Sequence, residues 1–122
     1  MAVKDKVVEK RYKDLEEFGK NVLAYRFKFD DAMRPVVRFS REYSSKEIQK
    51  KVESEKQLMD SAYKLLNDEF RINFNLVKGV EKDSYKKFLG SYQERLEKLN
   101  EEARSTATRM MSEATSASYK SL

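Results

Sequence analysis

A long row of apolar side chains at helical spacing constrains the fold of this chain more than any other sequence feature. The row starts at Val8, advances alternately by three and four residues, and ends at Tyr43, with ten of its eleven positions apolar or aromatic. Its members are Val8, Arg11, Leu15, Phe18, Val22, Tyr25, Phe29, Ala32, Val36, Phe39 and Tyr43. Because a 3.5-residue repeat places such positions on one side of an α-helix, the row predicts a long helix with a coiled-coil-like face.

Three local features compete with uninterrupted helix. Pro35 lacks a backbone N–H and its ring clashes with the preceding turn, so it predicts a kink near Asp31. Residues 25–29 alternate between aromatic and charged side chains with period two, which is typical of a strand, and residues 70–76 alternate in a similar way. A hairpin within 22–43, in an α+β fold, is therefore the alternative. We expect the helix, because it accounts for thirty-six residues and the strand for five.

Two further rows predict a second and a third helix. Ser44 followed by Glu47 fits a capping box, and Gly79 provides a stop signal. The row between them is Ile48, Val52, Met59, Tyr63, Leu66, Phe70, Phe74, Val77 and Val80. Asp83 or Ser84 can cap the third helix. The third row is Tyr85, Phe88, Tyr92, Leu96, Leu99, Ala103, Ala107, Met110 and Ala114.

These rows predict an all-α fold, an antiparallel three-helix bundle or coiled coil with long helices and a first helix kinked at Pro35. The connections near Ser44 and Lys82 are short, so neighbouring helices must run antiparallel. We expect one helical domain over residues 1–111 and a mobile tail rich in Ser, Thr and Ala over 112–122. A bundle this thin leaves apolar surface uncovered, so we also expect a homo-oligomer, with a dimer favoured.

The composition removes most catalytic chemistry. The chain contains neither cysteine nor histidine, which excludes thiol nucleophiles, imidazole bases, disulfides and the usual zinc sites. Its three glycines are dispersed, so it lacks a phosphate-binding loop. We therefore expect no enzyme activity, no metal, no cofactor and no small-molecule substrate.

The positive charge is concentrated in one segment. Residues 20–51 hold nine basic and four acidic side chains, and this excess equals the net charge of +5 of the whole chain. Three arginines at four- and three-residue steps share one helical face. The segment is either a solvated surface or a strip that binds the phosphates of nucleic acid or of an acidic membrane. Its candidate anion-binding residues are Arg34, Arg38, Arg41, Lys20, Lys28, Lys46, Lys50 and Lys51.

The apolar residues outside the first row are candidates for a partner interface. Leu23, Phe27 and Val37 fall off the row that predicts the core. We therefore expect a non-enzymatic assembly or scaffolding module that self-associates and docks a protein partner of unknown identity. The alternative is a small basic helical protein that binds nucleic acid or an acidic membrane surface. With no leader-like start and no long apolar stretch, we expect a soluble, intracellular, cytoplasmic protein.

Overall fold

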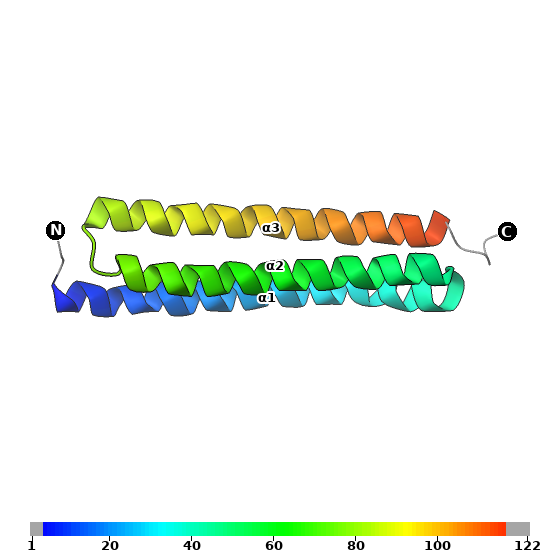
Figure 1. Cartoon of the computed structure of the whole chain (residues 1–122), viewed down its shortest axis with the longest axis horizontal. Coiled ribbons are helices and arrows are strands. Elements are labelled where there is room, and N and C mark those ends of the chain that lie inside the picture. Colours follow the sequence, from blue (N-terminus) through cyan, green and yellow to red (C-terminus); the bar gives the residue numbers. More distant parts are fainter. Residues whose placement is uncertain (1–3, 117–122) are drawn as a thin grey trace.

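Residues 4–116, which the computed structural model describes, form a bundle of three long helices (Figure 1). These are α1 (Asp5–Tyr43), α2 (Lys46–Val77) and α3 (Lys82–Ser116). Each helix contacts both others, and α2 runs antiparallel to α1 and α3. The predicted antiparallel three-helix bundle is confirmed. Because residues 4–116 contain no strand, the hairpin in 22–43 and the strand in 70–76 are wrong.

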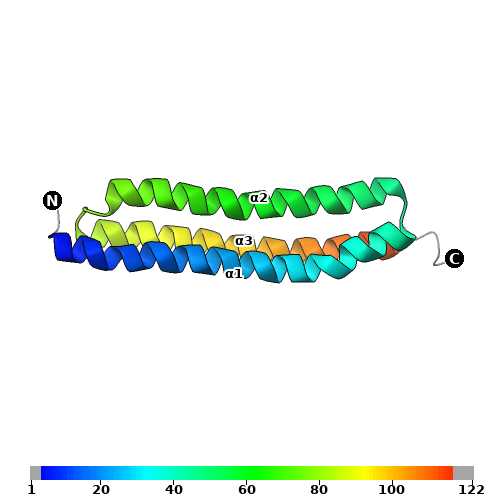
Figure 2. The same ribbon diagram turned by 90° about the horizontal axis from the view of Figure 1, so that it is seen from below.

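Helix α1 continues through Pro35 without a break. Pro35 has no N–H to donate to the carbonyl of Asp31, one turn earlier. Both residues are exposed, so water can replace the missing hydrogen bond. Figure 2 shows the cyan C-terminal part of α1 running at an angle to its blue N-terminal part. The alternation at 25–29 reflects helix faces instead of a strand, because Phe29 is buried while Phe27 is 58% exposed.

The core contains an aromatic cluster at one end and smaller side chains at the other. Phe18 of α1 stacks on Phe70 of α2, with ring centroids 4.0 Å apart, and Tyr92 of α3 meets Phe70 edge-on at 5.3 Å. Towards the end of α3 the buried positions are mostly Ala and Met. The apolar rows of α2 and α3 are buried or half-buried, as predicted.

The row of α1 needs one correction. Met33 and Ser40 are fully buried, whereas Ala32 is exposed and Phe39 is half-buried. A strict 3.5-residue repeat drifts by about 20° per heptad from a helix of 3.6 residues per turn. The buried side therefore passes from Phe29 to Met33 instead of to Ala32.

The residues that cap α2 and α3 differ from those predicted. Ser45 is the N-cap of α2, and its hydroxyl accepts a hydrogen bond from the Ile48 N–H. Ser44 is buried, and its hydroxyl donates to the Ala114 carbonyl at 2.9 Å, so it serves the contact with α3 instead. At α3, the Glu81 carboxylate accepts from the backbone N–H groups of Asp83 and Ser84.

Arg11, the one charged residue in the first row, is buried and caps the C-terminal end of α2. Its guanidinium Nη1 donates to the carbonyls of Lys78 at 3.0 Å and Val80 at 2.6 Å, just after α2 ends. The guanidinium also lies over the Tyr85 ring, 4.1 Å from its centroid. Gly79 does not adopt a positive φ, so the end of α2 relies on this side chain and not on a left-handed glycine.

The helical part extends past the predicted boundary at residue 111. Helix α3 continues to Ser116, and Ala114 is fully buried against the other helices. Residues 117–122 of the predicted tail lie outside the described residues. No helix in the described range is both long and apolar enough to cross a bilayer.

Candidate functional site

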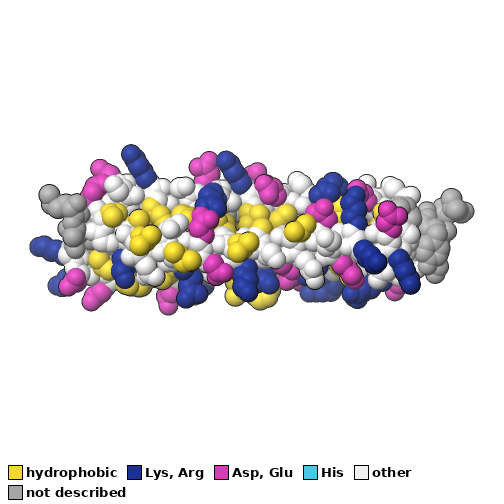
Figure 3. Space-filling model, viewed as in Figure 1, with side chains coloured by type: hydrophobic (Ala, Val, Ile, Leu, Met, Phe, Trp, Pro, Cys, Tyr) yellow, Lys and Arg dark blue, Asp and Glu magenta, His cyan; other side chains and the backbone are white. Residues whose placement is uncertain are grey.

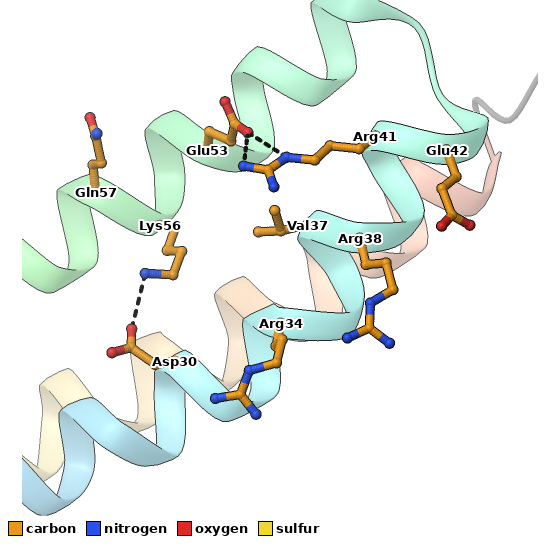
Figure 4. Close-up of a pocket in the computed structure, with 9 residues that line it drawn as sticks. All are labelled: Asp30, Arg34, Val37, Arg38, Arg41, Glu42, Glu53, Lys56 and Gln57. Carbon is orange, nitrogen blue, oxygen red and sulfur yellow. Dashed lines mark hydrogen bonds and ion pairs between the residues drawn. The ribbon is translucent and has the colours of Figure 1, made fainter.

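The three predicted arginines line a groove between the C-terminal part of α1 and the N-terminal part of α2 (Figure 4). The groove has a volume of about 770 Å³. Its lining residues are Asp30, Arg34, Val37, Arg38, Arg41, Glu42, Glu53, Lys56 and Gln57. Four of these side chains are cationic and three are carboxylates, so the groove is close to neutral and not strongly basic.

Two of the three arginines already bind a carboxylate of the chain. Arg41 crosses to α2, where its Nε and Nη2 donate to Glu53 Oε1 at 3.1 and 3.0 Å. Arg34 pairs with Asp31 on its own helix at 2.8 Å. Figure 4 shows Arg34 and Arg38 pointing away from α2. Of these three arginines, Arg38 alone makes no ion pair with any residue in 4–116, so its guanidinium remains available to an anion.

Lys56 joins the two helices at the floor of the groove. Its Nζ lies 3.1 Å from Asp30 of α1 and 2.9 Å from Asp60 of α2. Burial alone lowers the pKa of Lys56, but hydrogen bonds to Asp60 and Asp30 outweigh it and raise that pKa. This lysine therefore stays charged and serves the packing of α1 against α2.

The other predicted cations do not form one strip. Lys51 pairs with Glu113 of α3 at 2.9 Å, and Lys28 lies 5.7 Å from the centre of the Tyr25 ring. Lys20 precedes Arg38 by eighteen residues on α1, which is about 27 Å along the helix. Lys46 and Lys50 begin α2, at the same end of the bundle as Arg38, and form no ion pair within the described chain.

The predicted partner-interface residues separate into two groups. Leu23 and Phe27 are 48% and 58% exposed on α1. Val37 is half-buried, packs against the core and lines the groove. Leu23 and Phe27 therefore remain available to a partner, whereas Val37 already has contacts within the bundle.

The largest group of exposed aliphatic residues lies on α2, outside the row that the sequence predicts for its core. We name Leu58, Leu65, Ile72 and Leu76 the α2 row; they are 64%, 66%, 65% and 74% exposed. The first three are seven residues apart and the fourth follows by four, so all lie on one side of the helix. Figure 3 shows hydrophobic side chains gathered along the middle of this face, with charged side chains around them. The seven-residue spacing was visible in the sequence and was the signal that could have found this row.

A hollow of about 340 Å³ borders the α2 row on the side of α3. Ala62, Leu65, Leu66 and Leu99 provide its apolar lining. Its other lining residues are Glu69, Arg95, Lys98 and Glu102. Leu65 belongs both to the lining of the hollow and to the α2 row, so the two surfaces adjoin.

The charged residues around the α2 row fall into two classes. On the side of α3, Glu69 accepts hydrogen bonds from Arg95 and Tyr92, which lower the pKa of Glu69. On the other side, Lys64, Asp68 and Arg71 are exposed and have no ion-pair partner among residues 4–116. These three charges of α2 therefore remain available to another molecule.

Comparison of the chain with known protein families, with curated proteins and with solved structures found no match. Over residues 4–116, no three acidic side chains gather closely enough to hold a metal ion.

Proposed function

We propose that this chain is a non-enzymatic helical assembly module that associates with further copies of itself through the α2 row. The observation that carries the proposal is the exposure of four large aliphatic side chains on one side of one helix. Isolated apolar residues on a protein surface need no explanation, but several large aliphatic side chains on one side of a helix, bordered by charges, are typical of an interaction surface.

The energy available from the row suits a reversible dimer. Burying a leucine or isoleucine completely contributes about 1.5–3 kcal/mol, so a side chain that starts two-thirds exposed contributes about 1–2 kcal/mol. Leu58, Leu65 and Ile72 from two copies then contribute about 6–12 kcal/mol before the cost of association is subtracted. We therefore expect a dissociation constant of roughly micromolar order, below about 100 µM.

Size-exclusion chromatography with light scattering tests this proposal. Leu65→Glu places a charge in the centre of the row and should leave a monomer at concentrations where the unmodified chain is dimeric. Leu23→Glu is the matched control, because Leu23 is an exposed leucine on α1 outside the row. The proposal fails if all three proteins elute as monomers at 100 µM, or if Leu23→Glu dissociates the dimer and Leu65→Glu does not.

Anion binding is the second candidate function, supported by Arg38, Lys46 and Lys50, three cations at one end of the bundle that form no ion pair with any residue in 4–116. Three phosphate contacts predict a log–log salt dependence with a slope of about −3 for duplex DNA. Fluorescence anisotropy with labelled DNA and RNA, and flotation with acidic liposomes, measure such binding at 50 mM salt. Replacing these three residues by alanine should abolish it, whereas alanine at Lys82, Lys86 and Lys87 should not. Undetectable binding to all three probes refutes this candidate.

A further inference from the structure

The spacing of the α2 row is symmetric about Leu65. Leu58 precedes Leu65 by seven residues, and Ile72 follows it by seven. A two-fold axis perpendicular to α2 at Leu65 would bring Leu58 of one copy opposite Ile72 of the other, and Leu65 opposite itself. We infer that two copies of this chain pair through α2 in antiparallel orientation, with Leu65 at the two-fold axis. This inference rests on the proposed self-association and specifies its geometry.

The charges beside the row favour the antiparallel orientation. In an antiparallel pair, the same side of each α2 lies next to that side of the other, and the two sequences run in opposite directions. Lys64 of one copy therefore lies beside Asp68 of the other. Both residues are exposed and unpaired within the described chain, and the axis forms this pair twice. The second copy thus adds an opposite charge to the one that lies a turn away on the same helix.

The parallel orientation brings like charges together. The row and its neighbours follow a heptad in which Ala62, Glu69 and Leu76 alternate with Leu58, Leu65 and Ile72. A parallel, in-register pair would place Glu69 directly beside Glu69 of the second copy, and like charges at such a position are unfavourable. The antiparallel pair places Glu69 beside Ser61 and Ala62 of the second copy instead.

The shape of the surface agrees with an axis at Leu65. Ala62 lies one turn before Leu65, and the hollow between α2 and α3 opens at this point. A side chain of the second copy can enter the hollow next to the axis, as a knob enters a hole in a coiled coil. The helices α1 and α3 lie behind and beside α2 and leave its outer face open (Figures 1 and 3).

Disulfide trapping distinguishes the two orientations, because the natural chain contains no cysteine. Under mild oxidation, Leu65→Cys should form a covalent dimer, since a disulfide requires Cα atoms about 4.4–6.8 Å apart. Leu58→Cys alone and Ile72→Cys alone should not, because an antiparallel pair separates each from its own copy by about 21 Å. An equal mixture of Leu58→Cys and Ile72→Cys should form the mixed dimer. Ser91→Cys, on the exposed face of α3, measures trapping by random collision.

A charge-swap experiment tests the same geometry without cysteines. Lys64→Asp places a carboxylate at both positions of the inferred contact, and Asp68→Lys places an ammonium at both, so each variant should dimerise about tenfold more weakly than the unmodified chain. A mixture of the two should form heterodimers of restored affinity, since each position then faces the opposite charge. Unchanged affinity of both single variants would overturn the inferred contact between Lys64 and Asp68.

The outcomes separate this inference from the proposed function. Dimers that trap efficiently with Leu58→Cys alone and with Ile72→Cys alone show parallel pairing, which overturns the inference and leaves self-association intact. Dimers that form at full strength but trap none of the row cysteines beyond the Ser91→Cys level overturn both the inference and the use of the α2 row. A monomer at every concentration overturns the proposed function itself.

Discussion

Replacing Arg11 by methionine should destabilise the bundle strongly, although the change converts the break in an apolar row into an apolar residue. Methionine replaces the aliphatic stem of arginine, and its apolar side chain suits the 5% exposure of this position. It cannot donate hydrogen bonds, however, so the carbonyls of Lys78 and Val80 lose the guanidinium that joins the end of α2 to α1. A simple hydrophobic argument predicts the opposite sign, which makes the variant informative.

The expected loss follows from the contacts that disappear. Hydrogen bonds to a charged group contribute about 1.5–3 kcal/mol each, and the stacking on Tyr85 adds about 1 kcal/mol, whereas the variant no longer has to desolvate a guanidinium. We expect a net loss of about 2–3 kcal/mol in the free energy of unfolding. For a chain of this length, that loss corresponds to a decrease of about 10 °C in Tm.

Urea unfolding followed by far-UV circular dichroism measures this loss. Arg11→Lys should be intermediate, because an ammonium can reach one carbonyl but cannot bridge both and stack as a planar group. Lys10→Met is the matched control at an exposed neighbouring position and should change stability by less than about 0.5 kcal/mol. If Arg11→Met is as stable as the unmodified chain, the guanidinium does not hold the end of α2 and the reasoning is wrong.

Three further predictions concern the interior of the bundle. The Tyr63 hydroxyl is buried and has no hydrogen-bond partner in residues 4–116, so Tyr63→Phe should stabilise the fold by about 1 kcal/mol in urea unfolding. Burial raises the pKa of Tyr63 to about 12, and burial together with the Asp14 hydrogen bond raises the pKa of Tyr85. The folded state keeps these protons to a higher pH than the unfolded state does. The free energy of unfolding should therefore be constant up to about pH 10 and fall towards pH 12, and it should fall less steeply in Tyr63→Phe. A flat profile in both proteins would contradict this. Ser44→Ala removes the buried donor to the Ala114 carbonyl and should lower the free energy of unfolding by about 1 kcal/mol. An unchanged free energy of unfolding would count against this contact.

The architecture was predictable because helical periodicity is a local property of the sequence. Phe18, Phe70 and Tyr92 stand in three separate rows, and the structure brings all three rings into one cluster. Periodicity does not determine which atom of a side chain is used at a helix end. For that reason Ser45, and not the predicted Ser44, is the N-cap of α2, and the cap of α3 comes from Glu81, just before the two predicted residues.

The candidate site was less predictable because pairing across helices depends on their relative rotation and register. The spacing of Arg34, Arg38 and Arg41 indicated a shared face, but it could not show that Arg41 forms an ion pair with Glu53 of α2. The α2 row was missed for a different reason. Its leucines share a helix with a stronger aromatic row, and one row per helix is enough to explain a monomeric core.

Sedimentation equilibrium of the unmodified chain tests the central claim of self-association most directly. Between 1 and 200 µM, the mass should rise from the 14.4 kDa of one chain towards twice that value. The rise should persist in 1 M NaCl, because an apolar row supplies most of the attraction and salt does not screen it. A mass that stays at 14.4 kDa throughout, at either salt concentration, would contradict the proposed assembly.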